Sequence, residues 1–461
     1  MAARGPRRSV LSHASPIEPL SRQQKLLALG LILAVMLVAF EVTAVITALP
    51  TITDELGGDS LYGLSLAAYL LATMVALVAA GELADRYGPA LPFMINIAVF
   101  ISGLILAAAA PTMVWVVVGR VLQGAGTGGF QPIAYVLVKR AFPTSRQPTM
   151  YAFLGAGWVL PSLFAPAISG WVTNSFGWRW VFVGVIPFAL IVGALSVQPM
   201  RTYGPSVVDE RRPASRVPLA LAAAGGLGAI VTGLQISNPV AAVIIIAAGI
   251  GASLPALHRL MPHGVVRART GLAAVVACRM LATAAFLGID SFVPLAADRI
   301  HGVSPLVQGF VIVGAAVGWT GGQWRRARQP DLDPARAVRN GFIVMLIGIG
   351  LVSPVLSAHT PLVATFIAWA MGGIGMGLLF NPTTVSAMSH ATDGAEGLVS
   401  SQVAMADSVG FALMGGVGGA TVALADRTSF TLTGALGVNF AMAALLACVG
   451  IIASRGVGSA P

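Results

Sequence analysis

Five ionisable residues lie inside long apolar stretches of the 461-residue sequence: Glu41, Arg120, Arg279, Asp290 and Asp407. If these stretches cross a membrane, each unpaired charge at mid-bilayer costs about 2.5–3.5 kcal/mol. Together the five would cost on the order of 12–17 kcal/mol, as much as a typical whole folding free energy of about 5–15 kcal/mol. These groups must therefore pair with one another, reach an aqueous cavity or take up protons.

Glu41 and Arg120 are expected to meet. Glu41 lies 16 residues after Lys25, and Arg120 lies near the start of a run that crosses in the opposite direction, so both fall in the outer half of the membrane. Burial disfavours the charge of Glu41 and a neighbouring Arg120 favours it. A movement that changes their separation would therefore load or release a proton. A permanent structural ion pair is the alternative.

The other three charges have no partner that the sequence identifies. Arg279 and Asp290 are about three turns and roughly 16 Å apart on one helix face, so they cannot pair directly. For Asp290 a solvated position at the membrane surface is the alternative, whereas Asp407 is expected to face an inner cavity. We interpret Glu41, Arg120, Asp290 and Asp407 as proton-coupling candidates and Arg279 as a substrate-cavity residue.

Polar and aromatic side chains accompany these charges. Gln123 lies one turn after Arg120, and Gln131 and Asn381 each precede a proline. They suit the lining of a substrate cavity, with hydrogen bonds between helices as the alternative. Trp158 is a candidate for stacking on an apolar or cationic ligand, with packing as the alternative.

Helix-bending residues follow in the same stretch as Trp158. Pro161 and Pro166 each remove a helix hydrogen bond, and Gly157 lies next to the tryptophan. We expect these three residues to permit a bend at a moving interface.

The elements that position these residues must be membrane-spanning helices. The sequence is 56% hydrophobic and 10% charged, against about 25% charged residues in soluble domains. Stretches such as LLALGLILAVMLVAF are apolar all round and need lipid to cover them. About fourteen spans are predicted, near residues 25–50, 61–80, 92–110, 113–138, 149–173, 180–198, 218–236, 239–257, 270–297, 304–322, 339–357, 361–388, 398–424 and 431–453.

The distribution of basic residues predicts the orientation. With the N-terminus inside, 22 of the 27 Lys and Arg fall in cytoplasmic segments and three in external loops. This asymmetry places both termini in the cytoplasm. It also accounts for the net charge of +10 without a nucleic-acid partner.

An internal repeat divides the chain. GAGTGGFQP, ending at Pro132, and GIGMGLLFNP, ending at Pro382, are offset by 250 residues, and nearly the same offset relates Glu41 to Asp290. Repeats of this kind build many transporters. We predict a cytoplasmic tail (1–24), a six-helix bundle (25–200), an inserted two-helix hairpin with its cytoplasmic loops (201–268) and a second six-helix bundle (269–461).

Three segments resemble the major facilitator superfamily. GELADRYG, at 81–88, is similar to its loop signature, and GRVLQGAGTGG, at 119–129, to its span-four signature. EVTAVITALP, at 41–50, resembles the first span of the fourteen-span drug:proton antiporter branch, where an Asp usually stands at the Glu41 position. GAGWVLPSLFAPAISG, at 155–170, is similar to the signature associated with antiporters.

The resemblance implies an all-α integral membrane protein that works by alternating access, as a proton-coupled exporter of amphiphilic or lipophilic compounds. It also implies that the loop signature latches the two bundles together. The loop residues concerned are Gly81, Asp85, Arg86 and Gly88. The expected partners are protons, a small substrate and membrane lipids, for a monomer in the bacterial cytoplasmic membrane. A metabolite importer or uniporter of the same fold and a non-transporting lipid-binding protein are the alternatives.

Enzyme and metal chemistry are not indicated. The sequence contains no P-loop, HExxH, GxSxG or dinucleotide fingerprint. Its two cysteines, Cys278 and Cys448, lie in apolar runs without metal-ligand spacing. No enzyme activity, cofactor or metal is therefore expected.

Overall fold

Long helices make up nearly all of the chain that the computed structural model describes, namely residues 20–57, 61–205, 214–236, 238–303, 305–329, 332–427 and 430–458. Eleven helices within these ranges are long and apolar enough to cross a membrane. The chain is therefore a multi-pass membrane protein, and its described part contains no strand.

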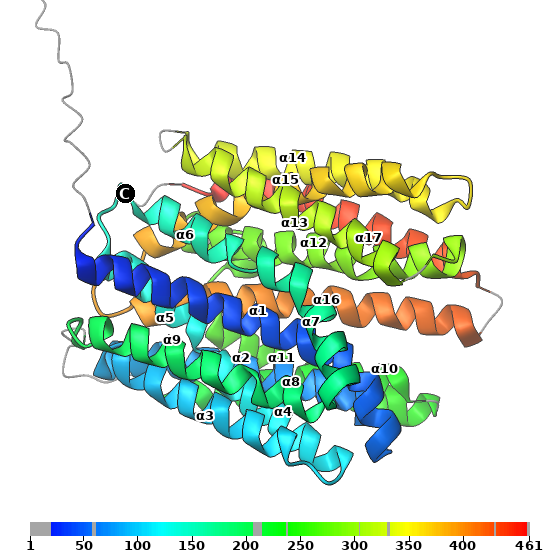
Figure 1. Cartoon of the computed structure of the whole chain (residues 1–461). Helices are drawn as coiled ribbons and strands as arrows, with labels where there is room; N and C mark the ends of the chain where they lie inside the picture. The colour runs from blue at the N-terminus through cyan, green and yellow to red at the C-terminus, as the bar shows by residue number, and fades with distance from the viewer. Residues whose placement is uncertain are drawn as a thin grey trace, which may run out of the picture.

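The helices before residue 201 form the first half of the chain, which is coloured blue to green in Figure 1. They are α1 (Arg22–Leu56), α2 (Tyr62–Tyr87), α3 (Ala90–Ala108), α4 (Met113–Thr127), α5 (Phe130–Ala141), α6 (Gln147–Ala156), α7 (Val159–Phe176), α8 (Arg179–Val183) and α9 (Val185–Met200). A hairpin of α10 (Val217–Gln235) and α11 (Pro239–Leu260) follows.

The remaining helices form the second half. They are α12 (Leu272–His301), α13 (Pro305–Ala327), α14 (Pro334–Val352), α15 (Leu362–Ser389), α16 (Glu396–Arg427) and α17 (Leu432–Ala453). α1 begins at the end of the molecule where the C-terminus also lies (Figure 1). We call this the basic end, because the Arg-rich connection from α13 to α14 lies there.

Three of the expected spans fall outside the eleven. The helices at 113–138 and 149–173 are interrupted, between α4 and α5 and between α6 and α7, and the third is α13. The total of fourteen crossings therefore stays a prediction. The described parts of the loops between these helices are short.

Packing joins the halves through a few helix pairs. Within the first half, α1 packs on α7 and α9, and α4 on α2 and α3; within the second, α15 packs on α13 and α14, and α12 on α16 and α17. Between the halves, α16 contacts α2 and α5, and α6 contacts α13 and α15.

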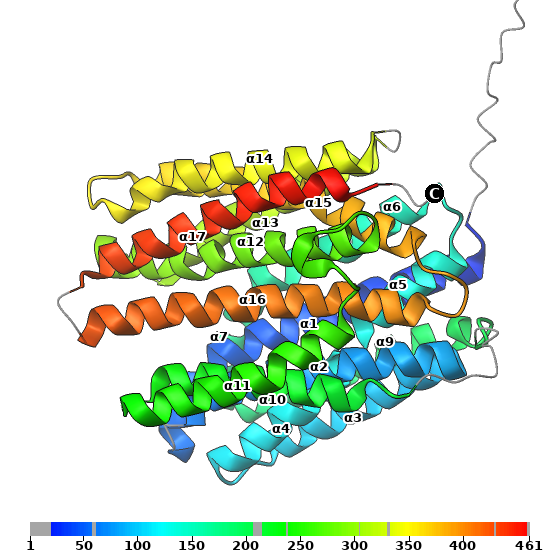
Figure 2. The same cartoon turned by 180° about the vertical axis from the view of Figure 1, so that it is seen from behind.

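The hairpin α10–α11 packs along one of these seams. Figure 2 shows it beside α2 and below α16. An apolar cluster contains Leu77 of α2, Leu227 of α10, Leu260 of α11 and Met405 of α16, each at most 5% exposed. The hairpin thus contacts one helix of each half.

Candidate functional site

Glu41 of α1 and Arg120 of α4 form a buried ion pair. Each side chain is 1% exposed. Arg120 also donates to Gln123 Oε1 at 2.7 Å, and its guanidinium lies 4.2 Å from the centre of the Tyr69 ring. The second oxygen of Glu41, Oε2, has no hydrogen-bond partner among the described residues. The pairing expected from the directions of the two helices is present.

A glycine lets α4 approach α2 closely enough for this arrangement. A Cβ on Gly124 would lie 2.2 Å from the carbonyl oxygen of Tyr69, a distance that real Cβ atoms do not reach. Thr73 of α2 donates to the Gly124 carbonyl at 3.2 Å, and Thr127 of α4 donates to the Tyr69 hydroxyl at 2.8 Å. The glycines of the span-four signature therefore hold Arg120 over Tyr69.

A second buried ion pair joins α12 to α16. Arg279, which is 0% exposed, donates through Nε to Asp407 Oδ1 at 2.6 Å and through Nη2 to Asp407 Oδ2 at 3.0 Å. Its Nη1 donates to the Phe380 carbonyl at 2.9 Å and to Thr384 at 2.9 Å. Thr283 donates to Asp407 Oδ1 at 2.8 Å. This two-point geometry is the strong form of the arginine–carboxylate contact.

The same network crosses to the first half. Gln131 of α5 donates through Nε2 to Asp407 Oδ2 at 3.3 Å and to the Tyr135 hydroxyl at 3.0 Å. Arg279 Nη2 also donates to the Tyr135 hydroxyl, at 3.4 Å. A change in the charge of Asp407 would therefore alter contacts between the halves.

Asp290 occupies the repeat-related position of Glu41 but has a different partner. Trp369 of α15 donates its indole N–H to Asp290 Oδ1 at 2.8 Å. Glu41 and Asp290 are 249 residues apart, and so are Arg120 and Trp369, which is one residue short of the 250-residue offset of the repeat. The two halves thus hold a carboxylate at equivalent places, one beside a cation and one beside a neutral donor. Asp290 is half-buried, so the alternative of a solvated position at the membrane surface stays a prediction.

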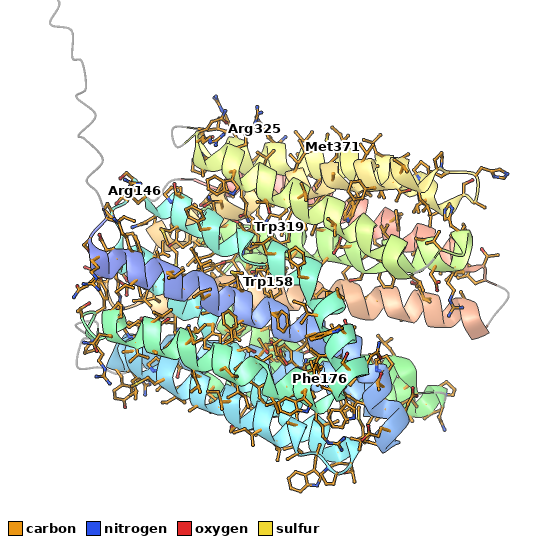
Figure 3. All side chains as sticks on the ribbon, in the orientation of Figure 1. Arg146, Trp158, Phe176, Trp319, Arg325 and Met371 are labelled. Atoms are coloured by element: carbon orange, nitrogen blue, oxygen red, sulfur yellow. The ribbon has the colours of Figure 1, made fainter. Side chains whose placement is uncertain are left out.

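Of the three expected cavity residues besides Gln131 and Arg279, two are buried and hydrogen-bonded and one is exposed. Gln123 is 0% exposed and binds Arg120, and Asn381, 2% exposed, donates across the halves to the Pro148 carbonyl at 2.7 Å. Trp158 is 46% exposed and lies about midway along the molecule (Figure 3).

The helix-bending residues lie at the junction of α6 and α7. Gly157 and Trp158 separate these two helices, Pro161 is in the first turn of α7, and Pro166 lies inside α7. Ser169, one turn after Pro166, donates to the Ala44 carbonyl of α1 at 2.6 Å. The helix is interrupted where a bend was expected, and a movement at this interface stays a prediction.

The loop signature meets the start of α16 at the basic end. Asp85 accepts hydrogen bonds from the backbone N–H groups of Gly397, at 2.8 Å, and Leu398, at 3.1 Å. A carboxylate at a helix N-terminus is favourable both as a cap and against the helix dipole. Arg140 of α5 donates to Glu396 at 2.9 Å and lies 3.6 Å from Asp85.

Glycine and basic residues complete this contact. A Cβ on Gly81 would lie 2.4 Å from the Gly397 carbonyl oxygen. Gly88 ends α2 with a φ of 78°, and Arg86 lies in the last turn of that helix. Lys139 donates to the Ala391 carbonyl; burial lowers the pKa of its ammonium, and the nearby Glu396 and Asp393 act in the opposite direction. We call the contact of Gly81 and Asp85 with Glu396, Gly397 and Leu398 the basic-end latch.

We expect Asp85→Ala to weaken the basic-end latch. Loss of a capping side chain costs about 1 kcal/mol, which is roughly a fivefold change in the ratio of closed to open molecules. Spin-label distances between the basic ends of α2 and α16 measure this ratio. Asp54→Ala, which removes an exposed carboxylate at the opposite end of α1, is the control and should leave the distances unchanged. Identical distance distributions for Asp85→Ala and wild type would contradict the latch.

Sequence reasoning did not identify several of these residues. Tyr69, Tyr135 and Thr283 belong to the two ion-pair networks, and Arg140 and Glu396 belong to the contact at the basic end. The spacing of Gln131 and Tyr135, one helical turn, was the one available signal for Tyr135. The described residues contain no group of three or more His, Cys, Asp or Glu arranged to hold a metal ion.

Comparison with known proteins identifies relatives over most of the chain. Residues 31–413 match the sequence model of the Major Facilitator Superfamily. The Bacillus subtilis protein named "Multidrug resistance protein 3" is 31% identical over 188 residues, which are 41% of this chain and 36% of that protein. The Mycobacterium tuberculosis protein named "Probable multidrug-efflux transporter Rv1634" is 28% identical over 373 residues, which are 76% of this chain and 77% of that protein.

Two solved structures share the fold. The human organic anion transporter MFSD10 (TETRAN) has a TM-score of 0.69 and 13% identity, covering 94% of this chain and 100% of that one. The proton:xylose symporter XylE has a TM-score of 0.66 and 13% identity, covering 93% and 94%.

Proposed function

This chain belongs to the Major Facilitator Superfamily, and from that premise we propose that it is a proton-coupled exporter of amphiphilic or lipophilic compounds. It is a transporter and not an enzyme. The proposal places it in the fourteen-span drug:proton antiporter branch, as a functional monomer that works by alternating access. The names of the Bacillus and Mycobacterium relatives support drug efflux as the kind of transport.

The surroundings of Glu41 are the observation that best supports proton coupling. This residue is a carboxylate on a membrane-spanning helix, 1% exposed, with one oxygen on Arg120 and the other without a hydrogen-bond partner among the described residues. The second oxygen is a place for a proton while the first still contacts Arg120. Movement of α1 relative to α4 changes the attraction of Arg120 and with it the affinity of Glu41 for the proton.

Asp407 and Asp290 have complementary roles in this proposal. Protonation of Asp407 weakens its ion pair with Arg279 and, at the same time, its contact with Gln131 of the other half. Asp290, held by the neutral donor Trp369, takes up a proton without breaking an ion pair. In this proposal, the two halves separate where α5 meets α16 once the hydrogen bonds of Asp407 with Arg279 and Gln131 have broken.

The rocking bodies are proposed to be residues 25–200 and 269–461, with 201–268 as an inserted hairpin. The helix pairs within each half, and the few between the halves, support this division. Because basic residues favour the cytoplasmic side of a membrane, the basic end and both termini are placed in the cytoplasm of a bacterial cell. The basic-end latch then closes the cytoplasmic side.

The substrate is proposed to bind between the halves near the middle of the molecule. Gln131 already bridges to the second half, and the exposed ring of Trp158 offers a stacking surface. Three further residues are proposed to support this region, because their hydrogen bonds hold the surrounding helices in place: Gln123, Arg279 and Asn381.

Transport of a fluorescent amphiphile into or out of proteoliposomes under an imposed pH gradient tests the proposal. We expect gradient-dependent flux for the wild type and at least about a tenfold loss for Glu41→Gln. Glu55→Gln is the matched control, because it is the same substitution on the same helix at a side chain that is 52% exposed. It should keep wild-type flux at equal incorporation.

Other outcomes favour other functions. Equal flux in wild type and Glu41→Gln assigns coupling to Asp290 or Asp407 instead. Flux of a polar metabolite without a pH gradient indicates a uniporter or importer. Absence of flux for every compound, with intact folding, favours the non-transporting, lipid-binding alternative.

A further inference from the structure

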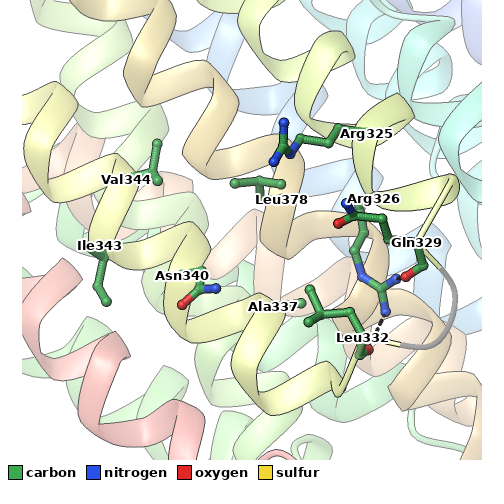
Figure 4. Close-up of a pocket in the computed structure, with 9 residues that line it drawn as sticks. All are labelled: Arg325, Arg326, Gln329, Leu332, Ala337, Asn340, Ile343, Val344 and Leu378. Carbon is green, nitrogen blue, oxygen red and sulfur yellow. Dashed lines mark hydrogen bonds between the residues drawn. The ribbon is translucent and has the colours of Figure 1, made fainter.

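A pocket of about 310 Å³ lies at the basic end, away from both ion pairs and from the basic-end latch. The C-terminal turn of α13, the first half of α14 and Leu378 of α15 form its walls (Figure 4). None of the residues that line it takes part in the transport site described above. A ligand bound here would therefore be separate from the transported substrate.

One end of the pocket is polar and positively charged. Arg325 is exposed at the basic end (Figure 3), and it donates no hydrogen bond to the part of the chain that the structure describes. Its neighbour Arg326 is fixed differently, because it donates to the Gln329 carbonyl and, at 2.9 Å, to the Leu332 carbonyl. Asn340, also exposed, adds an amide on the facing helix.

The other end of the pocket is apolar and extends along membrane-spanning helices. Ile343 and Val344 of α14 and Leu378 of α15 line this end (Figure 4). Ile343 is nine residues beyond the start of α14, which is roughly 13 Å along the helix axis. α14 and α15 are both among the helices apolar enough to cross a membrane. The polar end is thus at the depth of lipid headgroups and the apolar end at the depth of acyl chains.

We propose that this pocket binds an anionic phospholipid from the leaflet on the basic side. Its phosphate lies against Arg325 and within reach of the Asn340 amide, and the first part of one acyl chain lies against Ile343, Val344 and Leu378. The segment 323–340 carries five arginines against two aspartates, so its charge complements a lipid phosphate. Basic pockets between helices on the cytoplasmic side bind such headgroups.

A lipid accounts for the pocket better than a soluble anion does. A free phosphate would use the polar end alone and would make no use of the apolar wall formed by Ile343, Val344 and Leu378. A phospholipid covers both ends at once. The charged headgroup and the acyl chain of the lipid together also hold α13, α14 and α15 at the membrane surface. This role does not depend on whether the chain exports drugs.

Native mass spectrometry of the full-length protein in detergent, titrated with phosphatidylglycerol or phosphatidylcholine, tests this site. One basic side chain near an anionic headgroup contributes about 1 kcal/mol, which is roughly a fivefold difference in affinity. We expect phosphatidylglycerol to bind at least about fivefold more tightly than phosphatidylcholine. Arg325→Gln should remove most of this preference.

Arg328→Gln is the matched control. It makes the same change of charge three residues away, at an exposed arginine that does not line the pocket, and should retain the preference. Equal losses in the two variants would show that the whole loop attracts lipid by diffuse charge and would overturn the proposal. So would equal binding of the two lipids, or full displacement of phosphatidylglycerol by glycerol 3-phosphate at the same concentration, which indicates a soluble-anion site.

Discussion

Replacing Arg279 with methionine should destabilise the protein by about 3–5 kcal/mol and abolish transport. Arg279 is 0% exposed and donates to Asp407, to the Phe380 carbonyl and to Thr384. Its removal leaves Asp407 with two weaker neutral donors, Thr283 and Gln131. Removing one partner of a buried ion pair is costly, because the charge of the other partner is left uncompensated. Thermal unfolding in detergent micelles measures the loss.

The double variant Arg279→Met with Asp407→Leu separates stability from function. Because replacing both members of a buried ion pair with apolar residues is often nearly neutral, we expect most of the lost stability to return. Transport should stay absent, since the charged contact between α12 and α16 and its link to Gln131 are both gone. A double variant that transports at the wild-type rate would show that the pair is only structural.

Replacing Gly81 with valine should reduce transport to background. A Cβ at this position would lie 2.4 Å from the Gly397 carbonyl oxygen and 3.1 Å from the Ser401 Cβ. The carbonyl belongs to α16 and cannot turn away without breaking that helix. The ends of α2 and α16 therefore cannot close on each other, and alternating access stops with the basic end open. Flux in proteoliposomes measures the loss, and spin-label distances between the two helix ends measure the opening.

Gly63→Val is the control for this substitution. Gly63 lies in the first turn of the same helix, and a Cβ there has nothing within 4 Å. The control should transport like the wild type. Closed-state distances in Gly81→Val would mean that α2 and α16 adapt to the added side chain, and that the close approach at Gly81 is not required.

The repeat gives the two halves the same framework and different chemistry. Within one residue, the 250-residue offset of the repeat relates Glu41 to Asp290 and Arg120 to Trp369. In the first half a carboxylate faces a guanidinium, and in the second half a carboxylate faces an indole N–H. The first arrangement stabilises the charged acid by Coulomb attraction, whereas the second offers one hydrogen bond. Two acids in such different surroundings can respond to different steps of a transport cycle.

The amino-acid sequence alone determined that lipid surrounds this protein and how deep in the membrane its charged residues lie. Long apolar runs require lipid, and the order of residues along a helix sets how far each lies from the membrane surface. Depth and helix direction were sufficient to predict that Glu41 and Arg120 meet. The prolines were sufficient to predict a bend in the helix that follows Gly157.

Only the tertiary structure decided which helices face each other. The partner of Arg279 is Asp407, 128 residues later, and the link from Asp407 to the other half passes through Gln131 and Tyr135. Asp290 accepts a hydrogen bond from Trp369 of α15, a partner that the sequence did not indicate. Spacing along the chain constrains one helix at a time, whereas neighbours and rotations follow from the packing of all the helices together. For the same reason the pocket beside Arg325 is visible only after α13, α14 and α15 have assembled.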